Sequence, residues 1–155
     1  MLKRVLLIGL ALVLALSLLI GCNPRKALTA AEFTNLVEKA GYRIYNVTET
    51  FETENIKAAI QAVEPEDRFA IEFYVFATSE MAITMFNEIR NGLNAPSGTW
   101  YSKVEVNAAN YNIYRGTFNG VFYATARIDN TLLYVETEDT NKAAVDEMLK
   151  TLGYR

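Results

Sequence analysis

The sequence has no histidine and a single cysteine, Cys22. The absence of histidine excludes every catalytic triad that uses an imidazole base and every zinc site built from histidine. One cysteine excludes a disulfide bond within the chain. Charged residues are few, 21% of the chain against 51% hydrophobic residues, and this balance excludes a disordered chain. The length of 155 residues suits a single globular domain.

An excess of positive charge is also missing, because the formal net charge is −3. Proteins that bind nucleic acids carry a basic surface, so we expect no nucleic-acid partner. The sequence contains no glycine-rich phosphate loop, no Walker motif and no spacing of metal ligands. It therefore predicts no catalytic residue, no metal and no cofactor, and a protein that is not an enzyme.

The longest uncharged run lies at the start of the chain. Lys3 and Arg4 precede the apolar segment 5–20, VLLIGLALVLALSLLI. A positive start followed by a short apolar core is typical of a secretory signal peptide. The run is shorter than the ~20 residues that a transmembrane helix needs. The alternative is an uncleaved signal anchor.

The single cysteine follows this leader. Leu19-Ile20-Gly21-Cys22 resembles the lipobox of bacterial lipoprotein precursors, in which an aliphatic residue, a tolerant position and a small residue precede cysteine. The resemblance implies a diacylglycerol on Cys22, cleavage between Gly21 and Cys22, and often an acyl chain such as palmitate on the new amino group. Two or more acyl chains anchor a protein stably in a bilayer. The layout is similar to that of small lipoproteins of Gram-positive bacteria.

These features divide the chain into three parts. Residues 1–21 are the expected lipoprotein signal peptide, 22–28 a lipidated tether, and 29–155 a single extracytoplasmic α+β domain. The expected location is the extracytoplasmic side of the cell membrane, with acylated Cys22 in the lipid bilayer.

Residues 29–155 mix helical periodicity with strand composition. Thr29 and Glu32 form a capping box before the first helix, and Asn119-Gly120 is a strong hairpin signal. The predicted helices are 30–40, 80–91 and 142–152, the predicted strands are 42–48, 69–78, 111–118, 121–128, 132–138 and, less regularly patterned, 57–63 and 103–108, and 94–101 is predicted as a loop. The expected fold is α+β, an antiparallel sheet of about six strands with helices packed on one face, in the order α-β-β-β-α-β-β-β-α.

Alternation along the strands assigns the side chains to two faces of this sheet. Aliphatic residues and alanines fall on one face, which is the predicted core, while aromatic residues gather on the face expected to meet solvent. Tyrosine has a rigid apolar body and a polar tip, and is favoured at recognition surfaces. The candidate binding residues are Tyr74, Tyr114, Phe118, Tyr123, Arg127, Tyr134 and Glu136. The alternative is that these side chains only stabilise the sheet through cross-strand pairs.

The sequence thus predicts a non-enzymatic, membrane-anchored domain that binds a protein or another envelope component through the aromatic face. One alternative is a module that binds a small solute. A second alternative is an envelope hydrolase that uses two carboxylates, Glu136 and Glu138, which share one strand face.

Overall fold

The computed structural model describes residues 24–51, 54–94 and 100–155. The predicted signal peptide, Gly21 and the predicted acylation site at Cys22 lie outside the described residues. Within the described residues, no helix is both long and apolar enough to cross a bilayer.

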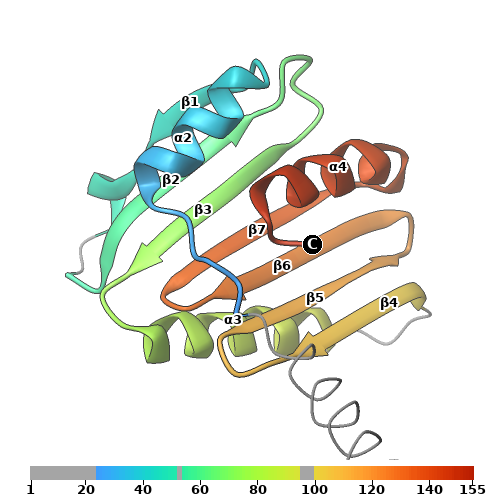
Figure 1. The fold of residues 1–155 in the computed structure, drawn as a ribbon. Helices are drawn as coiled ribbons and strands as arrows, with labels where there is room; N and C mark the ends of the chain where they lie inside the picture. Colours follow the sequence, from blue (N-terminus) through green and yellow to red (C-terminus); the bar gives the residue numbers. More distant parts are fainter. Residues whose placement is uncertain (1–23, 52–53, 95–99) are drawn as a thin grey trace, which may run out of the picture.

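The described chain folds around one antiparallel sheet (Figure 1). Its elements are α2 (Ala30–Lys39), β1 (Arg43–Asn46), β2 (Ile56–Val63), β3 (Ala70–Phe76), α3 (Ser79–Asn94), β4 (Trp100–Asn107), β5 (Tyr111–Phe118), β6 (Val121–Ile128), β7 (Thr131–Glu138) and α4 (Lys142–Leu152). The spatial order of the strands is β1-β2-β3-β7-β6-β5-β4. Strand β7 therefore joins the first three strands to the later meander, pairing with both β3 and β6.

The predicted α+β class and the antiparallel sheet are confirmed. The sheet has seven strands instead of about six, and the element order is α-β-β-β-α-β-β-β-β-α. The prediction is wrong at β4, which begins at Trp100, inside the segment predicted as a loop. A register shift between Trp100 and Ser102 marks the irregular start of this edge strand. Pairing with β5 supplies hydrogen bonds that local composition does not reveal.

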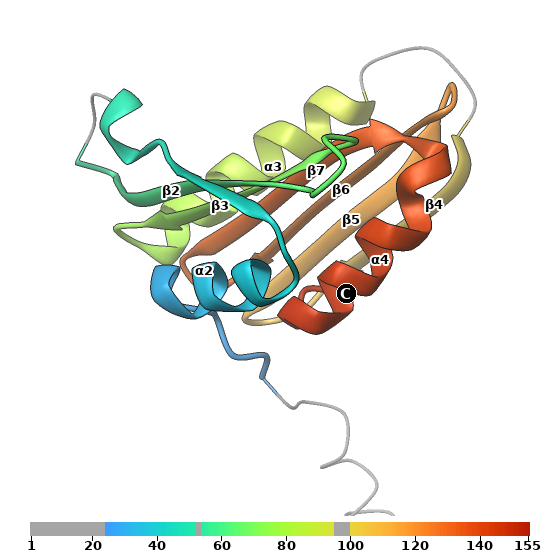
Figure 2. The ribbon, with the colours of Figure 1, turned by 90° about the horizontal axis from the view of Figure 1, so that it is seen from above.

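The helices lie on both faces of the sheet, so the prediction of helices on one face is wrong. Figure 2 shows α2 and α4 on one face and α3 on the other. The buried residues of α3, Ala82 and Phe86, pack against Phe76, Tyr114 and Leu132 of the sheet. Alternation shows which side chains share a strand face, but it does not show which face a helix will cover.

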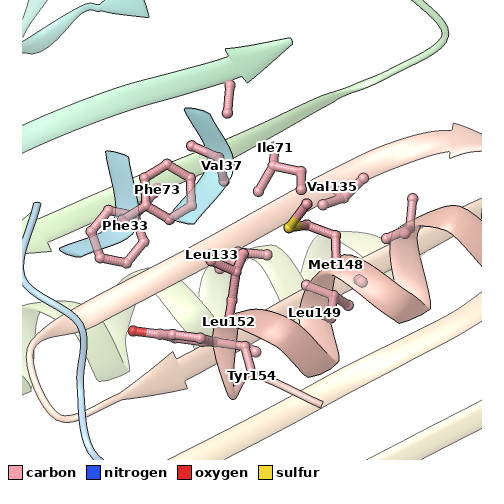
Figure 3. Packing of buried hydrophobic residues seen from close by; sticks show 14 of the residues in the cluster. Phe33, Val37, Ile71, Phe73, Leu133, Val135, Met148, Leu149, Leu152 and Tyr154 are labelled. Carbon is pink, nitrogen blue, oxygen red and sulfur yellow. The ribbon is translucent and has the colours of Figure 1, made fainter. Parts of the chain in front are cut away.

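The face under α2 and α4 is the main core, as the alternation predicts (Figure 3). Phe33 of α2 stacks on Phe73 of β3, with ring centroids 4.4 Å apart and planes 7° apart. Tyr154, just beyond α4, meets the same Phe73 ring edge-on, and its hydroxyl lies 2.5 Å from the Thr131 hydroxyl. The positive φ of Gly153, 80°, turns the chain so that Tyr154 reaches this core.

The segment before α2 lies against the domain. The Arg25 guanidinium stands over the Tyr111 ring, 4.4 Å from its centroid, and donates a hydrogen bond of 3.1 Å to the Gly153 carbonyl. The Asn110 side-chain amide donates a hydrogen bond of 2.7 Å to the Arg25 carbonyl. These contacts fix where the described chain begins, beside the turn between β4 and β5.

Candidate functional site

The register of the sheet confirms that the seven candidate residues share the α3 face. Tyr114 and Arg127, however, are 0% and 2% exposed. The expectation that they lie on the solvent side is wrong, and for Tyr114 the reason is α3, whose buried residues pack against it. Arg127 does not pair with Glu136, since its guanidinium donates to the Asn112 side chain at 2.7 Å and to the Asp129 carbonyl at 2.9 Å.

An aromatic cluster fills the part of the α3 face on β4, β5 and β6. The Trp100 ring lies 5.7 Å from Tyr114, 5.5 Å from Phe118 and 6.3 Å from Tyr123, measured between centroids. Gly116 makes room for this ring, because an added Cβ would lie 2.8 Å from it and 2.2 Å from the Ser102 carbonyl oxygen. The close packing indicates that this part of the face stabilises the fold.

The other part of the α3 face is hollow. A cavity of about 400 Å³, here called the α3 groove, opens between α3 and strands β2, β3 and β7. It is lined by Phe51, Ile56, Glu72, Tyr74, Phe76, Met85, Ile89, Gly92, Leu93 and Tyr134. This volume lies within the ~300–1,000 Å³ that is usual for small-ligand pockets. Its lining is mostly apolar, with few polar groups, as in such pockets.

Aromatic rings form the sheet side of the α3 groove. Phe51 meets Tyr74 edge-on at 5.8 Å, and Tyr74 lies 6.2 Å from Phe76. Across from them, α3 contributes flexible aliphatic side chains, among them Met85 and Ile89. Both are half-buried, whereas Ala82 and Phe86 of the same helix are fully buried. The helix therefore holds the sheet through one stripe and leaves a second stripe facing the groove.

Two tyrosines at the groove donate hydrogen bonds to carboxylates. The Tyr74 hydroxyl donates to Glu72 at 2.7 Å, and the Tyr134 hydroxyl donates to Glu136 at 2.8 Å. Burial first, and then the bonded carboxylate, raises the pKa of both tyrosines above the usual range. Both hydroxyls therefore stay protonated at neutral pH and act as donors.

These side chains form a continuous row across three strands. Glu72 of β3 lies opposite Tyr134 of β7, and Glu136 of β7 lies opposite Tyr123 of β6. Burial first, and then Glu136, raises the pKa of Tyr123 as well. We call Tyr74, Glu72, Tyr134, Glu136 and Tyr123 the tyrosine–glutamate row. Four of its members are among the seven candidates of the sequence, and the fifth, Glu72, lies between two of them.

The carboxylates proposed for a hydrolase are arranged differently. Glu136 and Glu138 are both exposed at the end of β7. A general acid of this type needs a carboxyl group in apolar surroundings that keep it protonated. Within the described residues, no group of three or more acidic side chains could hold a metal ion. The exposed positions of Glu136 and Glu138 do not provide such apolar surroundings.

Several groove residues were not among the sequence candidates. Phe51 follows a 3-10 turn (Thr48–Thr50), and Ile56 opens β2. Met85 and Ile89 carry the one signal that could have found them, an apolar repeat of four residues beside the buried stripe of α3. An apolar stripe on a helix that is wider than its buried contact with the sheet indicates a second apolar surface on that helix.

Comparisons with known proteins add little to this geometry. The sequence matches no family model and no curated protein. Among solved structures, the chain is similar to a GTP binding regulator from Thermotoga maritima, with 16% identity and a TM-score of 0.48 over 84% of this chain and 92% of the other. A likeness of this degree carries no argument about function.

Proposed function

We propose that the protein is a lipid-anchored, extracytoplasmic, non-enzymatic domain that binds a small amphipathic ligand in the α3 groove. The observation that carries the proposal is the groove itself, about 400 Å³ lined by aromatic and aliphatic side chains, with carboxylate and hydroxyl groups only on its sheet side. The lipobox Leu19–Cys22 supplies the anchoring part of the proposal.

A small ligand accounts for the groove better than a broad protein partner does. The sequence-based hypothesis of a protein-binding face depended on seven side chains in contact with solvent. Two of these, Tyr114 and Arg127, are buried, and the rings of Phe118 and Tyr123 pack with Trp100. The remaining open part of the face is concave, which suits a ligand that enters it.

The anchoring part is tested by labelling cells with radioactive palmitate. We expect label on the wild-type protein and recovery in the detergent phase after phase separation. Cys22→Ser should lose the label. A Cys22→Ser protein that is still labelled would contradict lipid attachment at this residue.

The binding part is tested by a thermal-shift screen of small amphipathic compounds against the full-length protein in phosphatidylcholine nanodiscs. A ligand that binds the folded state raises the melting temperature, and the rise grows with the ratio of ligand concentration to Kd. Ile89→Trp fills the groove and should abolish the shift. Ile83→Trp is the matched control, because Ile83 is exposed on the same helix and does not line the groove. If no compound shifts the wild type, or both variants behave alike, the groove is not the binding site.

A further inference from the structure

Glu72 and Glu136 place two negative charges beside the α3 groove. Glu72 lines the groove directly. Glu136 accepts a hydrogen bond from the hydroxyl of Tyr134, which also lines the groove. A tyrosine hydroxyl neutralises no charge when it donates a hydrogen bond. Glu72 therefore presents a negative potential inside the groove, where the apolar walls reduce the screening by water, and the exposed Glu136 adds a weaker, solvent-screened potential from beside Tyr134.

Neither carboxylate has a positive partner within the described residues. Glu72 and Glu136 take part in none of the ion pairs found there, whereas several cations of the chain pair with other carboxylates. Arg43 pairs with Asp67, and Arg90 pairs with Glu105 at 3.2 Å. A cationic ligand would thus meet two carboxylates without having to displace an internal partner.

The aromatic rings of the groove also favour a positively charged ligand. The face of an aromatic ring is electronegative and attracts ammonium groups, so rings and carboxylates act in the same direction. Elsewhere in the described part of the chain, three rings already have a cation over them, and two of these cations are Lys103, 5.1 Å from the centroid of Tyr114, and Lys142, 5.5 Å from that of Phe122. Within the described residues, no cation stands over Phe51, Tyr74 or Phe76.

We propose that the ligand of the α3 groove is a small organic cation, an ammonium group joined to an aliphatic or aromatic body. The ammonium group lies at the Glu72 and Glu136 side, and the apolar body lies between Tyr74 and Ile89. This inference rests on the proposed function, because it names the chemical class that the groove selects. An anionic ligand of the same shape would meet two like charges, and a neutral one would gain only the apolar contacts.

The test compares three probes of one shape. These are 3-phenylpropyl-trimethylammonium, its uncharged analogue with carbon in place of nitrogen, and the anion 4-phenylbutyrate. Binding to the full-length protein in phosphatidylcholine nanodiscs is measured by calorimetry or ligand-observed NMR, with empty nanodiscs subtracted. We expect the cation to bind at least about tenfold more tightly than the neutral probe, and the anion to bind most weakly.

Two variants locate the charge selection. Glu72→Gln and Glu136→Gln keep an acceptor for the tyrosine hydroxyls, so the row retains its hydrogen bonds while losing charge. Each variant should weaken binding of the cationic probe several-fold, and the double variant should remove the preference for the cation over the neutral probe. The affinity for the neutral probe should stay unchanged. Glu138→Gln is the control, because it removes a nearby exposed charge that bonds to no tyrosine.

The outcomes separate the two proposals. If all three probes bind equally, and Ile89→Trp abolishes them, the groove binds ligands but the cation inference is overturned. If Glu138→Gln weakens the cation as much as Glu72→Gln does, the selection comes from the general surface charge, and the inference is overturned as well. If none of the probes binds while another compound shifts the melting temperature through the groove, the inference fails and the proposed function stands.

Discussion

The two faces of the sheet differ in how completely helices cover them. Two helices, α2 and α4, lie on one face, and only α3 lies on the other (Figure 2). A helix with its side chains is about 10–12 Å wide, whereas seven strands at about 4.8 Å spacing span roughly 29 Å. Helix α3 reaches strands from β3 to β4, through Phe76 and the Arg90–Glu105 ion pair, but a single helix of this width leaves part of the face uncovered. The groove on the α3 face is therefore a consequence of having a single helix there, and most of the side chains that line it are partly open to solvent.

The residue types match this difference. The face under α2 and α4 carries Ala124 and Ala126, whose small size lets helices approach, and its central side chains, such as Phe73 and Leu133, are fully buried. The α3 face carries tyrosines with hydroxyls bonded to carboxylates, a chemistry that tolerates contact with water. Three changes test this comparison, and one further change, outside both faces, provides a reference against which their effects can be judged.

The largest effect is expected at the centre of the closed face. Phe73→Ala removes a ring that is 0% exposed and contacts both Phe33 and Tyr154. We expect a loss of about 3–5 kcal/mol in the free energy of unfolding, because the cavity cannot collapse between two packed layers. Urea denaturation measures it. A loss below about 1 kcal/mol would contradict a rigid core on this face.

The filled part of the α3 face should respond to an added methyl group. Gly116→Ala places a Cβ against the Ser102 backbone and the Trp100 ring, and the backbone cannot move aside as a flexible side chain would. We expect a loss of about 1–3 kcal/mol and displacement of Trp100, because added volume in a packed region forces strain. Tryptophan fluorescence during urea denaturation reports both. Unchanged fluorescence and stability would show that β4 packs more loosely than the rest of the sheet.

A third change lies outside both faces, in the turn between β2 and β3. Arg68 and the backbone N–H groups of Glu66 and Arg68 donate to the Glu64 carboxylate, and these bonds lower its pKa to about 2. A lowered pKa stabilises the fold above the ordinary value of 4.5, and this contribution is lost as the pH falls towards 2.

Glu64→Gln should therefore cost about 1 kcal/mol at pH 7, a modest value because the Arg68 side chain is partly exposed, and should flatten the pH dependence of unfolding between pH 4.5 and 2. Glu32, whose pKa is also lowered to about 2, first by its bond with Lys26, should maintain the remaining slope. An unchanged slope in Glu64→Gln would contradict the assignment.

The smallest effect is expected at the groove wall. Ile89→Ala removes a half-buried side chain beside space that is already open. We expect a loss below about 1 kcal/mol, because little new cavity is created. Phe86→Ala, one turn earlier and 1% exposed, is the matched control and should cost about 3 kcal/mol or more. Equal losses in the two variants would show that the groove wall is core.

Much of the fold could be predicted from local patterns. The capping box of Thr29 and Glu32 starts α2 as expected, with both reciprocal hydrogen bonds formed. Asn119 and Gly120 adopt the positive φ values, 50° and 81°, that their hairpin turn requires. Strand β4 was mispredicted at its start, because its pairing partner β5 lies further along the chain and sets its length.

The candidate site was only half visible in the sequence. Alternation correctly placed Tyr74, Tyr134 and Glu136 on one face, since strand side chains alternate with a fixed period. The sequence alone determined the residue chemistry and the strand faces, and the lipobox at Leu19–Cys22 stays a prediction. The tertiary structure decided which part of the aromatic face is covered, because helix α3 packs on that face with Phe86 in the same cluster as Tyr114 and Leu132. The groove beside it arises from the limited width of one helix, a property of the assembled layers and not of any local segment.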